Sequence, residues 1–151
     1  MNLPVVPSSC RAFPSLSGAC GELRRLARAG SPAAIDDLDQ LDPAEALLLL
    51  DFFLHDPEAT ETIEPFASIL SALHGKRPLG LWDLFPPAPG DGAEEAARER
   101  FLRVLPRDHQ ECMSCRCFPV CEGYAARARA CETWKAVISG IAAAARELSR
   151  P

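Results

Sequence analysis

Apolar residues recur at helical spacing along most of this chain, and the pattern predicts a mostly α-helical fold. A first helix is expected over 21–30, ending at Gly30, because glycine readily adopts the left-handed conformation that closes helices. Three more helices are expected over 32–41, 43–55 and 58–74. Together these segments would form a small helical bundle, and no segment shows the clear alternation of a strand.

Each of these three helices would begin with the same signal, a hydrogen-bond acceptor followed by a proline. The signals are Ser31-Pro32, Asp42-Pro43 and Asp56-Pro57. In 43–55 the apolar residues leave little polar surface, which is typical of a helix packed on more than one side. The stripe of 58–74 contains Pro65, where a kink is expected, and Gly75 would end that helix.

A stretch rich in proline and glycine over 75–92 divides the chain. We expect 1–20 to be irregular, 21–88 to be the helical N-terminal part, and 89–151 to be the C-terminal part. Three apolar residues of the connector would attach it to the bundle: Trp82, Leu84 and Phe85.

The C-terminal part is predicted to hold a helix over 92–105, a Cys-rich metal-binding loop, and a last helix from about Cys131. The inward residues of the first helix would be Phe101, Leu102 and Val104. Those of the last helix, spaced by one, three, four or seven positions, would be Trp134, Val137, Ile138, Ile141 and Leu148.

Composition narrows the function classes. The chain has 151 residues, 48% hydrophobic and 25% charged, with a net charge of −5. Because nucleic-acid binding depends on clustered Lys and Arg, nucleic acid is not expected as a partner.

The most apolar run carries Asp51 and is far shorter than the roughly 20 residues that span a bilayer, so no membrane segment is expected. The acidic residues of 36–42 would be a solvated face.

The N-terminus lacks a positive leader before an apolar run, so we expect a cytoplasmic protein. Seven cysteines, an odd number, favour metal or redox chemistry over disulfides in that compartment. Cys10 and Cys20 are interpreted as ordinary thiols. The other five lie within residues 112–131.

Two residues separate Cys112 from Cys115, five separate Cys115 from Cys121, and nine separate Cys121 from Cys131. A C-x2-C turn directs two thiolates into one small volume, and it occurs in both zinc and iron–sulfur sites. Redox-active or unliganded thiols are a third alternative. His109 could join a zinc site, although a solvated loop histidine is the simpler interpretation.

The segment CMSCRCFPVCEGYAARARACETWKAVISGI, residues 112–141, resembles the SPASM region of radical S-adenosylmethionine peptide-modifying enzymes. The first three cysteines of that family's C-x2-C-x5-C-x3-C run match Cys112, Cys115 and Cys121, and Cys131 matches a later cysteine that leads into a helix. The surroundings of the third cysteine match at Phe118, Pro119 and Gly123. Ala125 replaces the fourth cysteine of the run.

The resemblance implies one [4Fe–4S] cluster on Cys112, Cys115, Cys121 and Cys131, with Cys117 as the substitute for the fourth ligand. The cysteine missing at 125 would serve a different cluster in the family, so one cluster is expected. The C-x3-C-x2-C motif of the radical enzyme is absent, since Tyr124 stands where its third cysteine belongs. We therefore expect a stand-alone module without the radical core.

Such a module would assist a radical S-adenosylmethionine or other redox enzyme, by relaying electrons or by presenting a peptide substrate. Whether the chain is itself an enzyme stays open, and a non-catalytic accessory or electron-transfer role is the interpretation that we favour. The alternative is a zinc-stabilised helical module for protein–protein interaction, with Zn²⁺ on the same cysteines and no redox activity.

Overall fold

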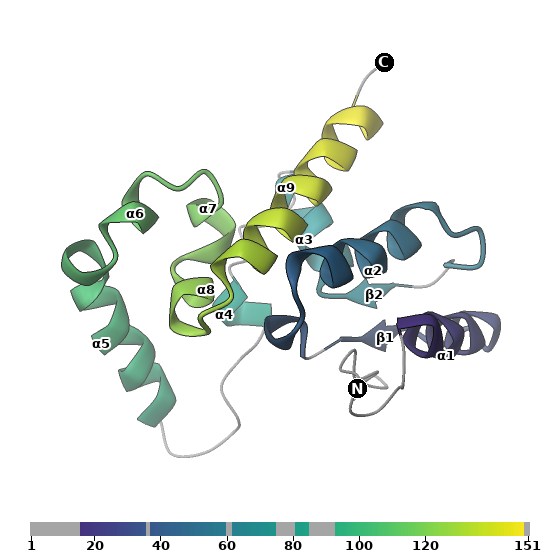
Figure 1. Ribbon diagram of the computed structural model, residues 1–151, viewed down its shortest axis with the longest axis horizontal. Helices are drawn as coiled ribbons and strands as arrows, with labels where there is room; N and C mark the ends of the chain where they lie inside the picture. Colours follow the sequence, from purple (N-terminus) through teal and green to yellow (C-terminus); the bar gives the residue numbers. More distant parts are fainter. Residues whose placement is uncertain (1–15, 36, 60–61, 75–80, 85–92, 150–151) are drawn as a thin grey trace.

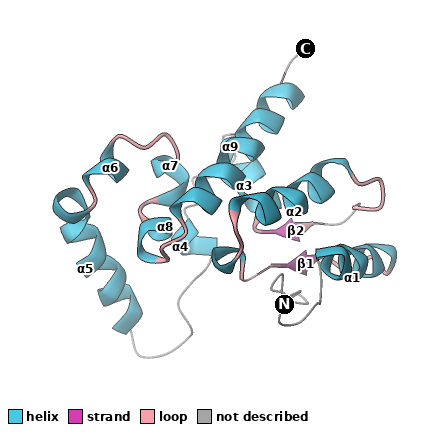
Figure 2. Cartoon of the chain, viewed as in Figure 1, coloured by secondary structure: helices cyan, strands magenta, loops and turns pink. Residues whose placement is uncertain are grey.

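The computed structural model describes residues 16–35, 37–59, 62–74, 81–84 and 93–149. Helices dominate these residues, which confirms the predicted mostly α-helical fold (Figure 1). Figure 2 shows that the strands form one short pair among the helices. The elements in chain order are α1 Leu16–Arg28, β1 Ala33–Ala34, the 3₁₀ helix η1 Leu38–Gln40, α2 Pro43–His55, β2 Ile63–Glu64, α3 Phe66–Leu73, α4 Leu81–Leu84, α5 Ala93–Asp108, α6 Gln110–Met113, α7 Phe118–Cys121, α8 Tyr124–Arg127 and α9 Cys131–Leu148.

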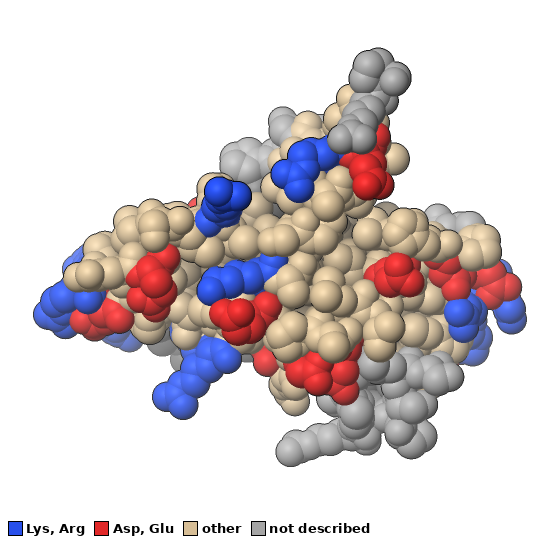
Figure 3. All heavy atoms as spheres, turned by 45° about the horizontal axis from the view of Figure 1, so that its top comes forward, with Lys and Arg blue, Asp and Glu red and all other residues tan. Residues whose placement is uncertain are grey.

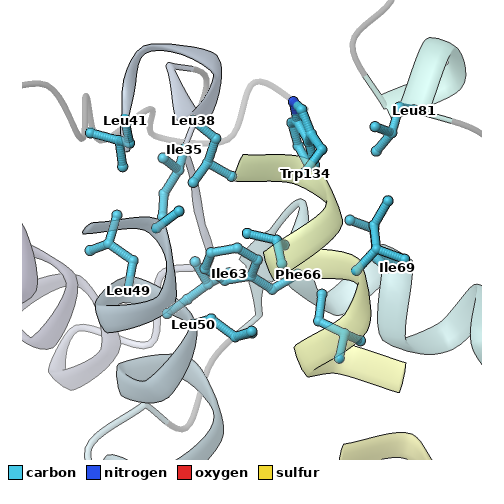
Figure 4. Close-up of a cluster of buried hydrophobic side chains, with 14 of the residues drawn as sticks. Ile35, Leu38, Leu41, Leu49, Leu50, Ile63, Phe66, Ile69, Leu81 and Trp134 are labelled. Atoms are coloured by element: carbon cyan, nitrogen blue, oxygen red, sulfur yellow. The ribbon is translucent and has the colours of Figure 1, made fainter. Parts of the chain in front are cut away.

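The C-terminal helix α9 is the centre of the fold, because it packs against both α2 and α3. The predicted inward residues Trp134, Val137, Ile138 and Ile141 are buried there, whereas Leu148 is 68% exposed and does not join the core. Figure 4 shows how these helices and the segment before α2 contribute to one cluster of apolar side chains. Helix α9, which begins at the last of the clustered cysteines, therefore shares a core with the N-terminal helices.

The helix predicted over 32–41 is wrong. Ala33 and Ala34 form a strand that pairs in parallel with Ile63 and Glu64 of β2, and a short 3₁₀ turn follows. Burial explains the difference, because the apolar side chains of this segment, Ile35 and Leu38 among them, fill the core along this path.

The start of the third predicted helix is also wrong, because α3 begins at Phe66 and not near 58. Proline is tolerated at helix starts, and Pro65 is the N-cap of α3 instead of a kink within it. The Asp56 carboxylate accepts the Glu58 N–H in a turn after α2, so Asp56 ends one helix without opening the next. Asp42 is the N-cap of α2, as predicted, in a capping box with Glu45.

Helix α2 does not have both of its faces covered by the described residues. Leu49 and Leu50 are buried against α9, whereas Leu47 is 41% exposed and Leu48 is 57% exposed. Helix α2 thus packs against α9 and against α1, as predicted, while the side that carries Leu47 and Leu48 stays exposed within this part of the chain.

The connector and α5 meet their predictions in part. Trp82 is buried, and its Nε1 donates to the Glu122 carbonyl oxygen, while the side chains of Leu84 and Phe85 lie outside the described residues. In α5, Phe101 packs against Trp82, as predicted. Val104 is 37% exposed, however, and Leu105 is the buried residue in its place. Among the described residues, no helix is both long and apolar enough to cross a membrane.

Candidate metal centre

Between the long helix α5 and the start of α9, the chain forms the short helices α6, α7 and α8 (Figure 1). The five clustered cysteines lie on α6 and α7, in the turn that joins them, and at the first residue of α9. Cys112 lies in α6, Cys115 in the turn that follows it, and Cys117 is the N-cap of α7. Cys121 ends α7, and Cys131 is the first residue of α9. Each change of direction between these elements brings another sulfur back toward the same side.

The reversal between α7 and α8 depends on two residues with positive φ, Glu122 at 47° and Gly123 at 81°. Only glycine adopts this conformation without cost, and the Gly123 position also contacts the side chain of Leu105 in α5. Gly123 therefore permits the sharp local path of the backbone beside Cys121.

All five cysteines of 112–131 line a single cavity of about 390 Å³. The same cavity is lined by Ala125, the position at which the family pattern has its fourth cysteine. The remaining lining residues are Glu111, Phe118, Gly123, Ala126, Glu132, Trp134, Lys135 and Ile138. Sequence reasoning did not place Trp134 and Ile138 there, although they lie three and seven positions after Cys131 on one helix and so share its face.

Burial decides the protonation of these sulfurs. It raises the pKa of the Cys112, Cys121 and Cys131 thiols above the ordinary value, because the charged form loses hydration. Backbone N–H groups oppose this effect at Cys121, where the Ala125 N–H lies 3.4 Å from Sγ. Without a bound metal, these sulfurs are neutral thiols at neutral pH.

The cavity reaches the protein surface beside two exposed charged residues at the start of α9. Lys135 Nζ lies 3.0 Å from Glu132 Oε1, and both residues line the cavity. The ammonium lowers the pKa of Cys131, in opposition to the larger effect of burial. The Lys135 ammonium thus lies beside the cysteines that line the cavity.

Cys117 differs from the other four because it also belongs to the hydrophobic core. Its thiol is 8% exposed and forms hydrogen bonds with the side chains of Ser139 and Cys115. Burial raises its pKa as well. Cys117 therefore lines the cavity together with the other four cysteines. To bind a metal, it would have to give up its contacts with Ser139 and Cys115.

In the described part of the chain, no three His, Cys, Asp or Glu side chains form a group that could hold a metal ion. His109 does not line the cavity, and it instead packs against Phe101 and lies 3.5 Å from Glu111. Cys20 lies on α1 near Arg24 and Asp56, whereas Cys10 lies outside the described residues.

Asp39 fixes the cysteine-bearing segment to the N-terminal half, a role that sequence reasoning missed. Its carboxylate accepts the Trp134 Nε1–H and also the Tyr124 hydroxyl, the latter at 3.0 Å. The Tyr124 and Trp134 rings meet edge to face, with centroids 6.1 Å apart. The expectation of a solvated acidic face is therefore wrong at Asp39, and also at Asp37, which is buried.

Comparisons with protein-family models, with curated proteins and with solved structures found no match to this chain.

Proposed function

We propose that this protein is an iron–sulfur accessory protein that holds one [4Fe–4S] cluster on Cys112, Cys115, Cys121 and Cys131. The observation that carries the proposal is the lining of one cavity by all five cysteines of the segment. Thiolates are the ligands of such clusters, and four of them complete the set.

The cavity supports a cluster over a single ion, because no three of the described His, Cys, Asp or Glu side chains already form a group that could hold one ion. A tetrahedral zinc site with Zn–S bonds near 2.3 Å needs sulfurs within about 4 Å of one another. Here the five cysteines surround a cavity of about 390 Å³. The ligands of a four-iron core attach at its corners and stand farther apart than those of one ion, so cysteines that line a common cavity fit such a core better.

One-electron transfer is the chemistry that a bound cluster supplies. The chain's own residues would set the conditions for it. Trp134 and Ile138 exclude water from one side, the Ala125 N–H donates toward Cys121 Sγ, and Lys135 places a positive charge at the opening. Hydrogen bonds and nearby cations stabilise the more negative, reduced form of a cluster.

We further propose that the protein assists a radical S-adenosylmethionine or other redox enzyme, by electron relay or by presenting a peptide. The family resemblance of residues 112–141 supports this partner class. The position of the cavity also supports it, because Glu132 and Lys135 place its opening at the surface, where a partner could approach.

Anaerobic purification tests the cofactor. We expect a brown protein with broad visible absorption and about four iron and four sulfide per chain. Cys121→Ser should lose at least half of the iron, while the matched variant Cys20→Ser, outside the cavity, should keep all of it. A colourless protein with one zinc per chain would instead establish the zinc-stabilised interaction module.

The fourth ligand is tested by a second pair of variants. If Cys131 is the ligand, Cys131→Ser should lose the four-iron signal, and Cys117→Ser should retain it. The reverse result would assign Cys117 as the ligand, whose hydrogen bonds to Ser139 and Cys115 would then break on loading. Iron content and electron paramagnetic resonance of the reduced protein distinguish the two outcomes.

A further inference from the structure

Helix α2 presents a second apolar face, opposite the one that packs in the core. We name it the outer face of α2, and it consists of Ala44, Leu47, Leu48, Asp51, Leu54 and His55, at spacings that share one side of a helix. Leu47 and Leu48 are among the most exposed large apolar side chains of the described residues. This face is independent of the cysteine cavity and of the function proposed for it.

The outer face is hollowed on both sides of Leu48 and Asp51. A shallow hollow of about 560 Å³ is lined by Leu47, Leu50 and Leu54 together with these two residues. A second hollow of about 450 Å³ includes both of them and His55, next to α1. Contiguous exposed apolar surface with hollows is typical of sites where another protein element docks.

The charges around this face favour a basic partner. The nearby arginines of α1 already have acidic partners, with Arg24 Nη2 2.7 Å from Asp56 and Arg28 Nη2 2.7 Å from Glu58. Asp51 lies 3.8 Å from His55, which is charged only when protonated. The Asp51 side chain is 73% exposed, so the face offers a carboxylate between apolar residues. Figure 3 shows acidic and basic side chains next to one another at the right-hand end of the molecule, beside a wider uncharged surface.

We propose that the outer face of α2 binds a basic amphipathic helix of a partner protein. Leucine-like side chains of that helix would fill the two hollows beside Leu48, and a lysine or arginine would pair with Asp51. Helices bind such grooves through apolar residues three or four positions apart, and opposite charges determine which partner is accepted.

The test uses the full chain as purified and two fluorescent helical peptides, one of leucine and lysine and one of leucine and glutamate in the same positions. Fluorescence anisotropy should show saturable binding of the leucine–lysine peptide alone. The double variant Leu47→Gln/Leu48→Gln should weaken that binding by about tenfold or more, because two apolar contacts are lost. Leu148→Gln, an exposed leucine outside the face, should bind the peptide as the wild type does.

Charge reversal separates docking from general attraction to an acidic protein. Asp51→Lys should bind the leucine–glutamate peptide in preference to the leucine–lysine peptide, with unchanged circular dichroism. Equal binding by the wild type and the double leucine variant would overturn the proposal. So would a wild-type dimer in sedimentation equilibrium that Leu48→Gln converts to a monomer, because a second copy would then be the occupant.

Discussion

Gly123 joins α7 to α8 with a φ of 81°, and an added Cβ would overlap Leu105 Cδ1 and lie 3.3 Å from Phe101 Cε1. A side chain at this residue would therefore destabilise the fold in two ways, through the left-handed backbone conformation and through overpacking against α5. Gly30 has a φ of 66° with open space around its Cβ position, so a side chain there would have the first effect alone. Substitution of Gly30 is therefore a matched control for substitution of Gly123.

Gly123→Ala should lower the free energy of unfolding by about 3 kcal/mol, because the left-handed penalty and the steric overlap add. Gly30→Ala should lower it by only about 1 kcal/mol. Urea unfolding of the two variants measures the difference. Because Gly123 also lies two residues after Cys121, its variant should bind less metal, while Gly30→Ala should bind as much as the wild type. Equal destabilisation by both variants would show that the α5 side chains beside Gly123 cause no steric penalty.

At the scale of elements, the sequence was informative where a local signal agreed with burial. Asp42 and Glu45 form a local capping box, and α2 begins where that box predicts. The same Asp-Pro signal at Asp56 failed, because its carboxylate closes a turn with Glu58 and pairs with Arg24 of α1. That partner lies 32 residues away, and no local pattern reveals it.

The candidate site divides in the same way. The spacing of Cys112, Cys115 and Cys121 follows from adjacent turns, so these residues could be proposed from sequence alone. Asp39 could not, because its hydrogen bonds to Tyr124 and Trp134 depend on how distant elements pack. The failed helix over 32–41 has the same origin, since the pairing of Ala33 with Ile63 is a tertiary contact.

The Arg24–Asp56 pair joins α1 to the end of α2, and its contribution to stability should depend on pH. The guanidinium holds the pKa of Asp56 below its ordinary value. A lowered pKa in the folded state stabilises the protein above the unfolded pKa of about 3.9, and that stabilisation is lost as pH falls through the folded pKa. The pair should therefore stabilise the fold at neutral pH and cease to do so in acid.

Urea unfolding of Arg24→Gln, Asp56→Asn and the double variant would measure this coupling. We expect a positive coupling free energy at pH 7 that declines toward zero as the pH falls through the lowered pKa of Asp56. The wild type and Asp56→Asn should thus become more alike in stability as the solution is acidified. A coupling that is constant across this range would mean that the hydrogen-bond geometry, and not the charge of Asp56, connects the two helices.

At the scale of the whole molecule, the cysteine cavity and the N-terminal helices share one apolar core. Cys117, Val120 and Ala125 belong to the same buried cluster as Leu49 and Phe66. Asp39 adds a polar connection between the two halves through Tyr124 and Trp134. Whatever binds in the cavity is therefore expected to stabilise the entire fold and not a separate appendage.

Metal loading should also be coupled to proton release. Burial raises the pKa of Cys112, Cys121 and Cys131, so these sulfurs carry protons at neutral pH and must lose them to bind metal. Apparent affinity should then rise by about tenfold per pH unit for every ligand thiol that is still protonated, until pH exceeds the thiol pKa. The affinity must rise with pH and not fall, because protons and metal compete for the same sulfur atoms.

Iron retention against a chelator, measured between about pH 6 and pH 8.5, tests this coupling in the loaded protein. We expect retention to fall steeply toward acid, and the thermal unfolding midpoint to fall with it because the ligand-bound state is the more stable one. Cys20→Ser should follow the wild-type curve, since Cys20 lies on α1 outside the cavity. Retention independent of pH would mean that the ligands are ionised before metal arrives. In that case the Ala125 N–H and Lys135, not the bound metal, would offset the cost of burying charged sulfur.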